Sequence, residues 1–222
     1  MSLLDFLAIL QGAGATVGLS LSGIALGVPL GLALALARWG RVPIVAPIVA
    51  TYVSVMRATP AVTLALLIFF ALPNAGIEMD PVPTAILTLT LNTAAFNCEI
   101  WRAALLDFPR DQFDASVAFG MGSRLRFHRI ILPQIARGCL PALVNEMSLL
   151  IKASPAVAVL GIVDATRAAV RVGAETYRPL PPLLVALVIY AIIVAVFIVA
   201  QRSFERNRSA AAASPAPLAA TA

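Results

Sequence analysis

The chain has few charged residues and few of the side chains that enzymes use for catalysis. Only 12% of its 222 residues are Asp, Glu, Lys or Arg, it has one histidine and two cysteines, and aromatic residues make up 7%. Soluble domains carry about 25% charged residues, so this composition excludes an ordinary soluble domain. Hydrophobic residues make up 60% of the chain. With a mean hydropathy of +0.93, they predict an all-α integral membrane protein with several spans.

The reactive side chains are too scattered to form a catalytic or metal centre. Cys98 and Cys139 lie in or beside apolar segments, and His128 is the only histidine. We interpret all three as packing residues rather than as ligands. Because the sequence shows no arrangement of nucleophile, histidine and acid, we expect a chain that is not an enzyme by itself. We also expect it to bind no metal and no cofactor.

The net charge of +5 has a better explanation than nucleic-acid binding. The arginines cluster beside apolar segments, aromatic residues are few, and no nucleic-acid motif is present. We therefore expect the chain to contact a lipid bilayer and no nucleic acid.

Uncharged runs of the length that crosses a bilayer divide the chain. They predict five transmembrane helices, at about 14–37, 58–72, 83–105, 140–162 and 180–201. Residues 42–56 are also uncharged but contain Pro43 and Pro47, so we expect an interfacial or re-entrant lead-in to the second span. Residues 1–205 then form one transmembrane domain. The basic, Ala- and Pro-rich segment 206–222 is expected to be a disordered tail.

The distribution of arginines predicts the orientation of these spans. With the N-terminus outside and the C-terminus inside, eleven arginines lie in the inner segments and only three, Arg167, Arg171 and Arg178, in the outer ones. Short cytoplasmic loops carry the excess of basic residues. This places the charged segment 106–138 on the cytoplasmic side.

Segment 106–138 has the pattern of two short helices joined by a turn. Pro109 favours a helix start, and Gly120 favours a helix end at a positive φ. We expect Ser123 to cap the second helix and Pro133 to end it. An amphipathic interfacial hairpin that binds no partner would show the same pattern.

The spacing of this segment nevertheless resembles one family. Asp114-Ala115-Ser116, three residues, Gly120 and then Ile131-Leu132-Pro133 is similar to the EAA loop of ABC importer permeases, with Asp in place of Glu and Ser in place of the second Ala. In that family the loop is the cytoplasmic coupling element, which docks into a cleft of the ATP-hydrolysing subunit. The resemblance implies this role for six residues: Asp114, Ala115, Ser116, Gly120, Leu132 and Pro133.

Three further segments resemble the polar amino-acid uptake branch, the histidine/glutamine/arginine permeases. They are Arg57-Ala58-Thr59-Pro60, Glu99-Ile100-Trp101-Arg102 and Leu150-Ile151-Lys152. The chain departs from the family pattern at Ala58 and Asp111, which replace Gly, and at Ala153, which replaces Asp. The resemblance covers about residues 14–190 and implies the fold of a type I ABC importer permease.

The resemblance also implies a function and its partners. The chain would be the membrane-spanning permease of a binding-protein-dependent importer of a polar amino acid, in a bacterial inner membrane. Its partners would be a dimer of ATP-binding cassette subunits, a second identical or paralogous permease, and a periplasmic solute-binding protein. No Walker motif is present, so ATP and Mg would be bound by the partner ATPase.

Three alternatives to a polar amino-acid importer stay open. The same class of permease could carry an amino-acid derivative such as an opine, ectoine or cystine. An ion-coupled secondary transporter would work without an ATPase, although the inverted repeats that would support it are not evident. A non-transporting assembly protein would use the arginine-rich segment to recruit a cytosolic partner.

Polar residues inside the expected spans are candidates for the substrate pathway. Such residues normally face other protein groups or a water-filled path, and on this ground we select Asn97, Glu99, Lys152 and Arg57. Lys152 falls near mid-depth, where an unpaired charge costs at least ~2.5 kcal/mol. It either contacts a substrate carboxylate or forms a structural ion pair, for example with Glu99.

Three glycines of the first span share one helical face. Gly23, Gly27 and Gly31 are spaced four apart. This spacing predicts a close approach of another helix to that face.

Overall fold

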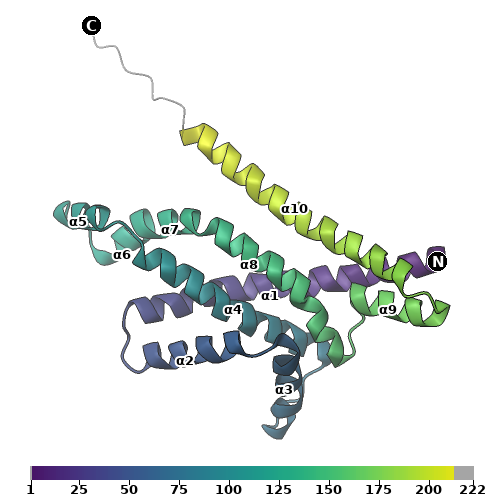
Figure 1. Cartoon of the computed structure of the whole chain (residues 1–222). Helices are drawn as coiled ribbons and strands as arrows, with labels where there is room; N and C mark the ends of the chain where they lie inside the picture. Colours follow the sequence, from purple (N-terminus) through teal and green to yellow (C-terminus); the bar gives the residue numbers. More distant parts are fainter. Residues whose placement is uncertain (1, 213–222) are drawn as a thin grey trace.

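The computed structural model describes residues 2–212, with side chains for residues 2–203. All regular elements in this part of the chain are helical (Figure 1). They are α1 Leu3–Trp39, α2 Val45–Ala58, α3 Ala61–Asn74, α4 Pro81–Leu106, α5 Arg110–Ala118, α6 Ser123–Arg126, a π-helical turn Phe127–Ile131, α7 Leu132–Gly138, α8 Leu140–Ala153, a 3₁₀ helix Ser154–Leu160, α9 Ala165–Thr176 and α10 Leu180–Ala212.

The centre of the fold is the contact between α1 and α4, which the three glycines permit. A Cβ atom added at Gly23 would lie 2.8 Å from the Cβ of Leu89, and one at Gly31 would lie 2.7 Å from the Cβ of Asn97. The contacts advance in the same direction along both helices, so α1 and α4 are parallel. The predicted close approach is confirmed, because only a residue without a side chain fits at these distances.

Two membrane-length segments are broken in the middle. Helices α2 and α3 meet at an angle of 115°, at the Thr59–Pro60 step. Helix α8 changes to the 3₁₀ helix at Ser154-Pro155. The two breaks are neighbours, because Ala65 of α3 packs in one apolar cluster with Leu150 and Val157 of the α8 segment.

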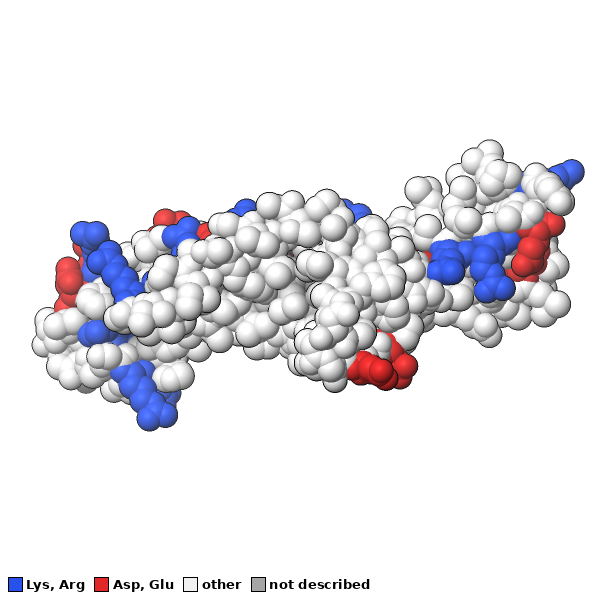
Figure 2. Space-filling model, turned by 90° about the horizontal axis from the view of Figure 1, so that it is seen from below, with Lys and Arg blue, Asp and Glu red and all other residues white. Residues whose placement is uncertain are grey.

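Within the described residues, three segments are long and apolar enough to cross a membrane: Leu3–Trp39, Leu140–Leu160 and Leu180–Ser203. The bent α2–α3 pair is a fourth if it forms one span. Helix α4 has 26 residues, which is long enough, but its threonines, asparagines and charged residues make it less apolar. In Figure 2 the charged side chains gather mainly toward the two ends of the long axis, and a mostly uncharged band separates them.

Helices extend into three segments outside the expected spans. Most of the expected lead-in 42–56 lies in α2, a regular 14-residue helix. Pro47 lies in its first turn, where no backbone N–H donor is required. Helix α9 lies between the fourth and fifth expected spans. Helix α10 continues to Ala212, so the first part of the expected disordered tail 206–222 is helical, and 213–222 lie outside the described residues.

The end of the molecule opposite the α5–α7 segment is held together by a buried polar junction. Asp164 begins α9 and accepts a hydrogen bond from the backbone N–H of Arg167 at 2.8 Å. Its other carboxylate oxygen accepts a hydrogen bond from the Tyr190 hydroxyl of α10 at 3.1 Å. Thr16 of α1 accepts a bond from the backbone N–H of Ala165 at 3.3 Å. Helices α1, α9 and α10 are thereby joined at one end (Figure 1).

Candidate functional site

Residues 106–138, the coupling element, connect α4 to α8 through two short arms. The first arm, α5, starts directly after Pro109, as predicted. It ends at Gly120, whose φ is +71°. The backbone N–H of Gly120 donates to the carbonyl oxygen of Val117 at 2.9 Å, and that of Met121 to Ser116 at 3.1 Å. This is a Schellman C-cap, and the predicted glycine turn is confirmed.

The second arm differs from the prediction at both of its ends. Gly122, and not Ser123, occupies the capping position, and no side chain caps the helix. Pro133 does not end the arm, because α7 continues through it to Gly138. The π-helical turn directly before α7 explains this, since its wider hydrogen-bonding pattern accommodates a residue that lacks an N–H group.

The two arms are held against each other by one cation–π contact. The guanidinium carbon of Arg126 lies 4.2 Å from the centroid of the Phe113 ring. Arg126 also donates to the carbonyl oxygen of Met121 at 3.4 Å. The contact with Phe113 crosses the Gly120 turn, and the bond to Met121 fixes Arg126 within the second arm, so the coupling element is a folded unit and not a free loop.

The six residues selected for coupling differ in their exposure. Asp114 and Ala115 are exposed, whereas Ser116 is 2% exposed and donates a hydrogen bond to the carbonyl oxygen of Phe113 at 2.6 Å. Leu132 and Pro133 are partly buried. Ser116 therefore shapes the turn, and the side chains of Asp114 and Ala115 are the most open to a partner.

Two exposed apolar side chains of this element were missed by the sequence reasoning. Phe119, directly before the turn, is 87% exposed, and Leu125 is 52% exposed. An apolar side chain beside a turn glycine, within a charged segment, was the available signal. Exposed aromatic groups of this kind are typical of surfaces that bind another protein.

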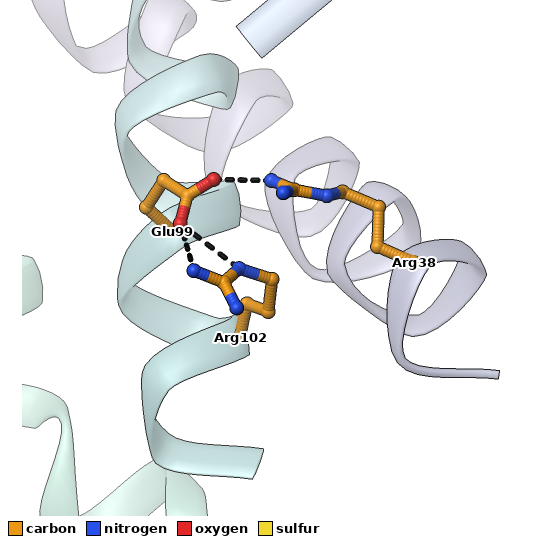
Figure 3. A network of polar contacts seen from close by, with 3 residues as sticks. All are labelled: Arg38, Glu99 and Arg102. Atoms are coloured by element: carbon orange, nitrogen blue, oxygen red, sulfur yellow. Dashed lines mark hydrogen bonds and ion pairs between the residues drawn. The ribbon is translucent and has the colours of Figure 1, made fainter. Parts of the chain in front are cut away.

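Glu99 lies at the junction of α1 and α4, and it also lines a cavity together with Pro109 and Gln134 of the coupling element. It accepts hydrogen bonds from Nε of Arg102 at 2.9 Å and from Nη2 at 2.7 Å. Its other oxygen forms an ion pair with Arg38 of α1 (Figure 3). Glu99 is therefore committed to two arginines, and the alternative of a Glu99–Lys152 ion pair is wrong.

Asn97 is fully buried against α1 and belongs to a polar chain between α4 and α8. Its amide nitrogen donates to the carbonyl oxygen of Thr93 at 2.8 Å and to the Thr93 hydroxyl at 3.0 Å. That hydroxyl donates to Glu146 of α8 at 3.4 Å. Glu146 is 7% exposed and was not selected from the sequence, although a carboxylate inside an apolar span was a signal.

Comparison with known proteins identifies this arrangement. The family model "Binding-protein-dependent transport system inner membrane component" matches residues 27–209. The chain belongs to this family. It is the membrane permease subunit of an ABC importer, a transport component and not an ATPase.

Two curated relatives of this permease come from Bacillus subtilis strain 168. The arginine transport system permease protein ArtQ is 34% identical over 200 residues, which cover 90% of this chain and 91% of the relative. The L-cystine transport system permease protein TcyB is 33% identical over 193 residues, covering 86% and 82%.

Two solved structures are similar to this permease. A crystal structure of an amino acid ABC transporter with histidines has a TM-score of 0.83 and 28% identity, covering 93% of this chain and 99% of that one. An inward-facing structure of the MetNI methionine ABC transporter has a TM-score of 0.74 and 22% identity with the same coverage, which supports the fold alone.

The two remaining pathway candidates of the permease are exposed cations. Lys152 is exposed in the last turn of α8, and Arg57 is exposed in the last turn of α2. The guanidinium carbon of Arg57 lies 5.3 Å from the ring centroid of Phe96. Within the described part of the chain, neither residue forms a salt bridge. Of the four pathway candidates, Asn97 is buried and Glu99 is held by two arginines, whereas Lys152 and Arg57 are exposed.

Proposed function

We propose that this permease imports a polar amino acid and that it is driven by a separate ATPase through residues 106–138. The folded coupling element carries this proposal: it connects α4 to α8 and presents exposed Asp114, Ala115 and Phe119. The printed names of the relatives, which concern arginine and cystine, support the class of solute. An ion-coupled mechanism is not favoured, because the family works with binding proteins.

The proposed topology has five spans with the N-terminus outside and the C-terminus inside. The spans are α1, the bent α2–α3 pair, α4, the α8–3₁₀ segment and α10. The parallel arrangement of α1 and α4 supports this count, because one complete crossing by α2–α3 returns the chain to the outer side. The excess of arginines near the α5–α7 end supports a cytoplasmic position for that end.

The proposed mechanism is a lever. ATP-driven closure of the ATPase dimer would move the coupling element, and the cation–π contact between Arg126 and Phe113 would keep its two arms together. The motion would pass to α4 and α8, which the Thr93–Glu146 hydrogen bond links. Tilting these two helices would exchange outward for inward access.

The proposed assembly sits in a bacterial inner membrane. It contains two permeases, identical or paralogous, a dimer of ATP-binding cassette subunits that hold ATP and Mg, and a periplasmic solute-binding protein. A second permease is needed because the faces of Lys152 and Arg57 are exposed in the single chain. An exposed charge at membrane depth must face protein or water, and not lipid.

A gentle pull-down of tagged permease from nanodiscs tests the assembly. We expect a cytosolic ATPase to co-purify and to be lost when residues 112–134 are replaced by a flexible linker. A variant with a flexible linker in place of residues 206–222 is the control, and it should keep the ATPase. Folded permease that transports without any ATPase would reject the proposal.

An amino-acid derivative is the second candidate solute. The 33% identity to a permease for L-cystine is the observation that favours it. Competition for uptake by proteoliposomes that contain the complete importer would distinguish the two candidate solutes. A polar amino acid and a disulfide-linked derivative compete with each other only if the importer carries both.

A further inference from the structure

Two helices of equal length begin near the coupling element. Helices α2 and α8 both have 14 residues. Helix α2 starts next to the end of α1, which lines a groove with Phe113 and Phe127 of the coupling element. Helix α8 directly follows α7. Both helices therefore begin at the coupling end and break inside the molecule.

Each of these helices carries one cation at its thirteenth residue. These are Arg57, twelve residues after Val45, and Lys152, twelve residues after Leu140. At 1.5 Å per residue, both side chains lie about 18 Å along their helices, close to the middle of a hydrocarbon layer about 30 Å thick. Lys152 is the only lysine of the chain.

The carboxylates of the same helices do not balance these cations equally. The helices α2, α3, α4 and α8 and the 3₁₀ helix contain only Glu99 and Glu146. Glu99 is bound by Arg38 and Arg102, which leaves that group with one excess positive charge. Glu146 lies within the electrostatic reach of Arg57 and is 7% exposed. Among the described residues, no carboxylate forms an ion pair with Lys152.

The exposed face around Lys152 also fits a pathway better than lipid. Leu149, Lys152 and Ala153 are exposed, whereas Leu150 and Ile151 on the other side of the helix are 2% and 1% exposed. An unpaired lysine at this depth is costly unless water, protein or a solute meets it. Position 153, where the family pattern has Asp, is Ala153 and adds no negative charge.

We infer that the solute meets Lys152 with a carboxylate and carries no net positive charge. Amino acids with acidic or neutral side chains are then accepted, and those with basic side chains are rejected. This inference rests on the proposed function and narrows its solute class.

Direct binding to the permease–ATPase complex tests the charge preference. The complex in nanodiscs, without nucleotide and without binding protein, is titrated with radiolabelled L-glutamate, L-glutamine and L-arginine. We expect L-arginine to bind about tenfold more weakly than L-glutamate, or weaker still. Equal or tighter binding of L-arginine overturns the inference and leaves the proposed function intact. Absence of any amino-acid uptake by the complete importer would instead reject the proposed function.

Charge reversal at Lys152 sharpens the test. In Lys152→Glu we expect L-arginine binding to appear and L-glutamate binding to weaken about tenfold. Lys152→Met, which adds no charge, should bring the affinities for L-glutamate and L-arginine within about threefold of each other. The control Arg171→Glu makes the same charge change at an exposed residue of α9. It should change neither the affinity for L-glutamate nor that for L-arginine. A lysine that only offsets the α8 dipole would leave the preference unchanged in Lys152→Met, which also overturns the inference.

Discussion

At the scale of single residues, Gly120 and Gly122 have equally free surroundings but different backbone conformations. An added Cβ atom would meet nothing within 4 Å at either position. Gly120 has a φ of +71°, whereas Gly122 has −61°. Only the first conformation disfavours residues with a side chain. The pair therefore offers a matched comparison inside the coupling element.

We predict that Gly120→Val uncouples ATP hydrolysis from uptake. A β-branched residue in the left-handed region costs about 1–2 kcal/mol, and the turn can relieve this only by moving the two arms apart. The measurement is ATPase activity and solute uptake in the same proteoliposomes, with Gly122→Val as the control that should keep both. Normal coupled uptake by Gly120→Val would remove the turn from the mechanism.

The roles of some single residues could be predicted from the sequence, and the roles of others could not. Pro109 and Gly120 act through their own backbone preferences, so their roles could be predicted. The role of Pro133 could not, because the π-helical turn that accommodates it depends on how the whole arm packs. One partner of Glu99 was equally hidden, since Arg38 is 61 residues away and only the α1–α4 packing brings it near.

At the scale of elements, the α1–α4 contact and its ion pairs determine where the coupling element starts. Gly27 is the tightest point, because an added Cβ atom would lie 2.0 Å from Cγ2 of Thr93 and 3.1 Å from the carbonyl oxygen of Thr90. Gly18, on the same helix, has no atom within 4 Å of such a Cβ. The four-residue spacing predicted this face, but it did not indicate α4 as its neighbour.

We predict opposite effects of alanine at these two glycines. Gly27→Ala forces α1 and α4 apart and should destabilise the permease by about 1–3 kcal/mol. Gly18→Ala should be neutral or stabilising by up to about 1 kcal/mol, because alanine favours the helix. Thermal unfolding in detergent measures both variants. Equal melting temperatures would show that the close approach of the two helices is not required.

We also predict that Glu99→Gln loosens the inner end of α1. Both Arg38 and Arg102 would lose their carboxylate, and the side chains are 19–32% exposed, so the expected loss of stability is about 1–2 kcal/mol. Asp107→Asn, at the end of the same helix, is the control, because Asp107 forms no salt bridge in the described part of the chain. Limited proteolysis between α1 and α2 should increase for Glu99→Gln only. Unchanged cleavage would show that the ion pairs of Glu99 with Arg38 and Arg102 do not hold the inner end of α1 in place.

At the scale of the whole molecule, the proposed topology depends on one segment, the bent α2–α3 pair. If it crosses the membrane, the α3–α4 connection lies outside, and α1 and α4 run in the same direction across the bilayer, as their parallel packing requires. If it re-enters, that connection and the start of α4 lie inside. The sequence left the choice between these two paths open through Pro43 and Pro47, and the 115° bend is compatible with either path by itself.

We predict that the pair crosses. In a variant whose native Cys98 and Cys139 are replaced by alanine, single cysteines are placed at Ala75, Ala174 and Gly122, which are all exposed. A membrane-impermeant maleimide added to intact spheroplasts should label Ala75→Cys and Ala174→Cys, and it should label Gly122→Cys only after lysis. Labelling of Ala75→Cys only after lysis would make α2–α3 re-entrant, because the two other positions fix the sides independently. The parallel packing of α1 and α4 argues against that result, since two helices that cross in opposite directions cannot keep contacts that advance together from Gly23 to Gly31.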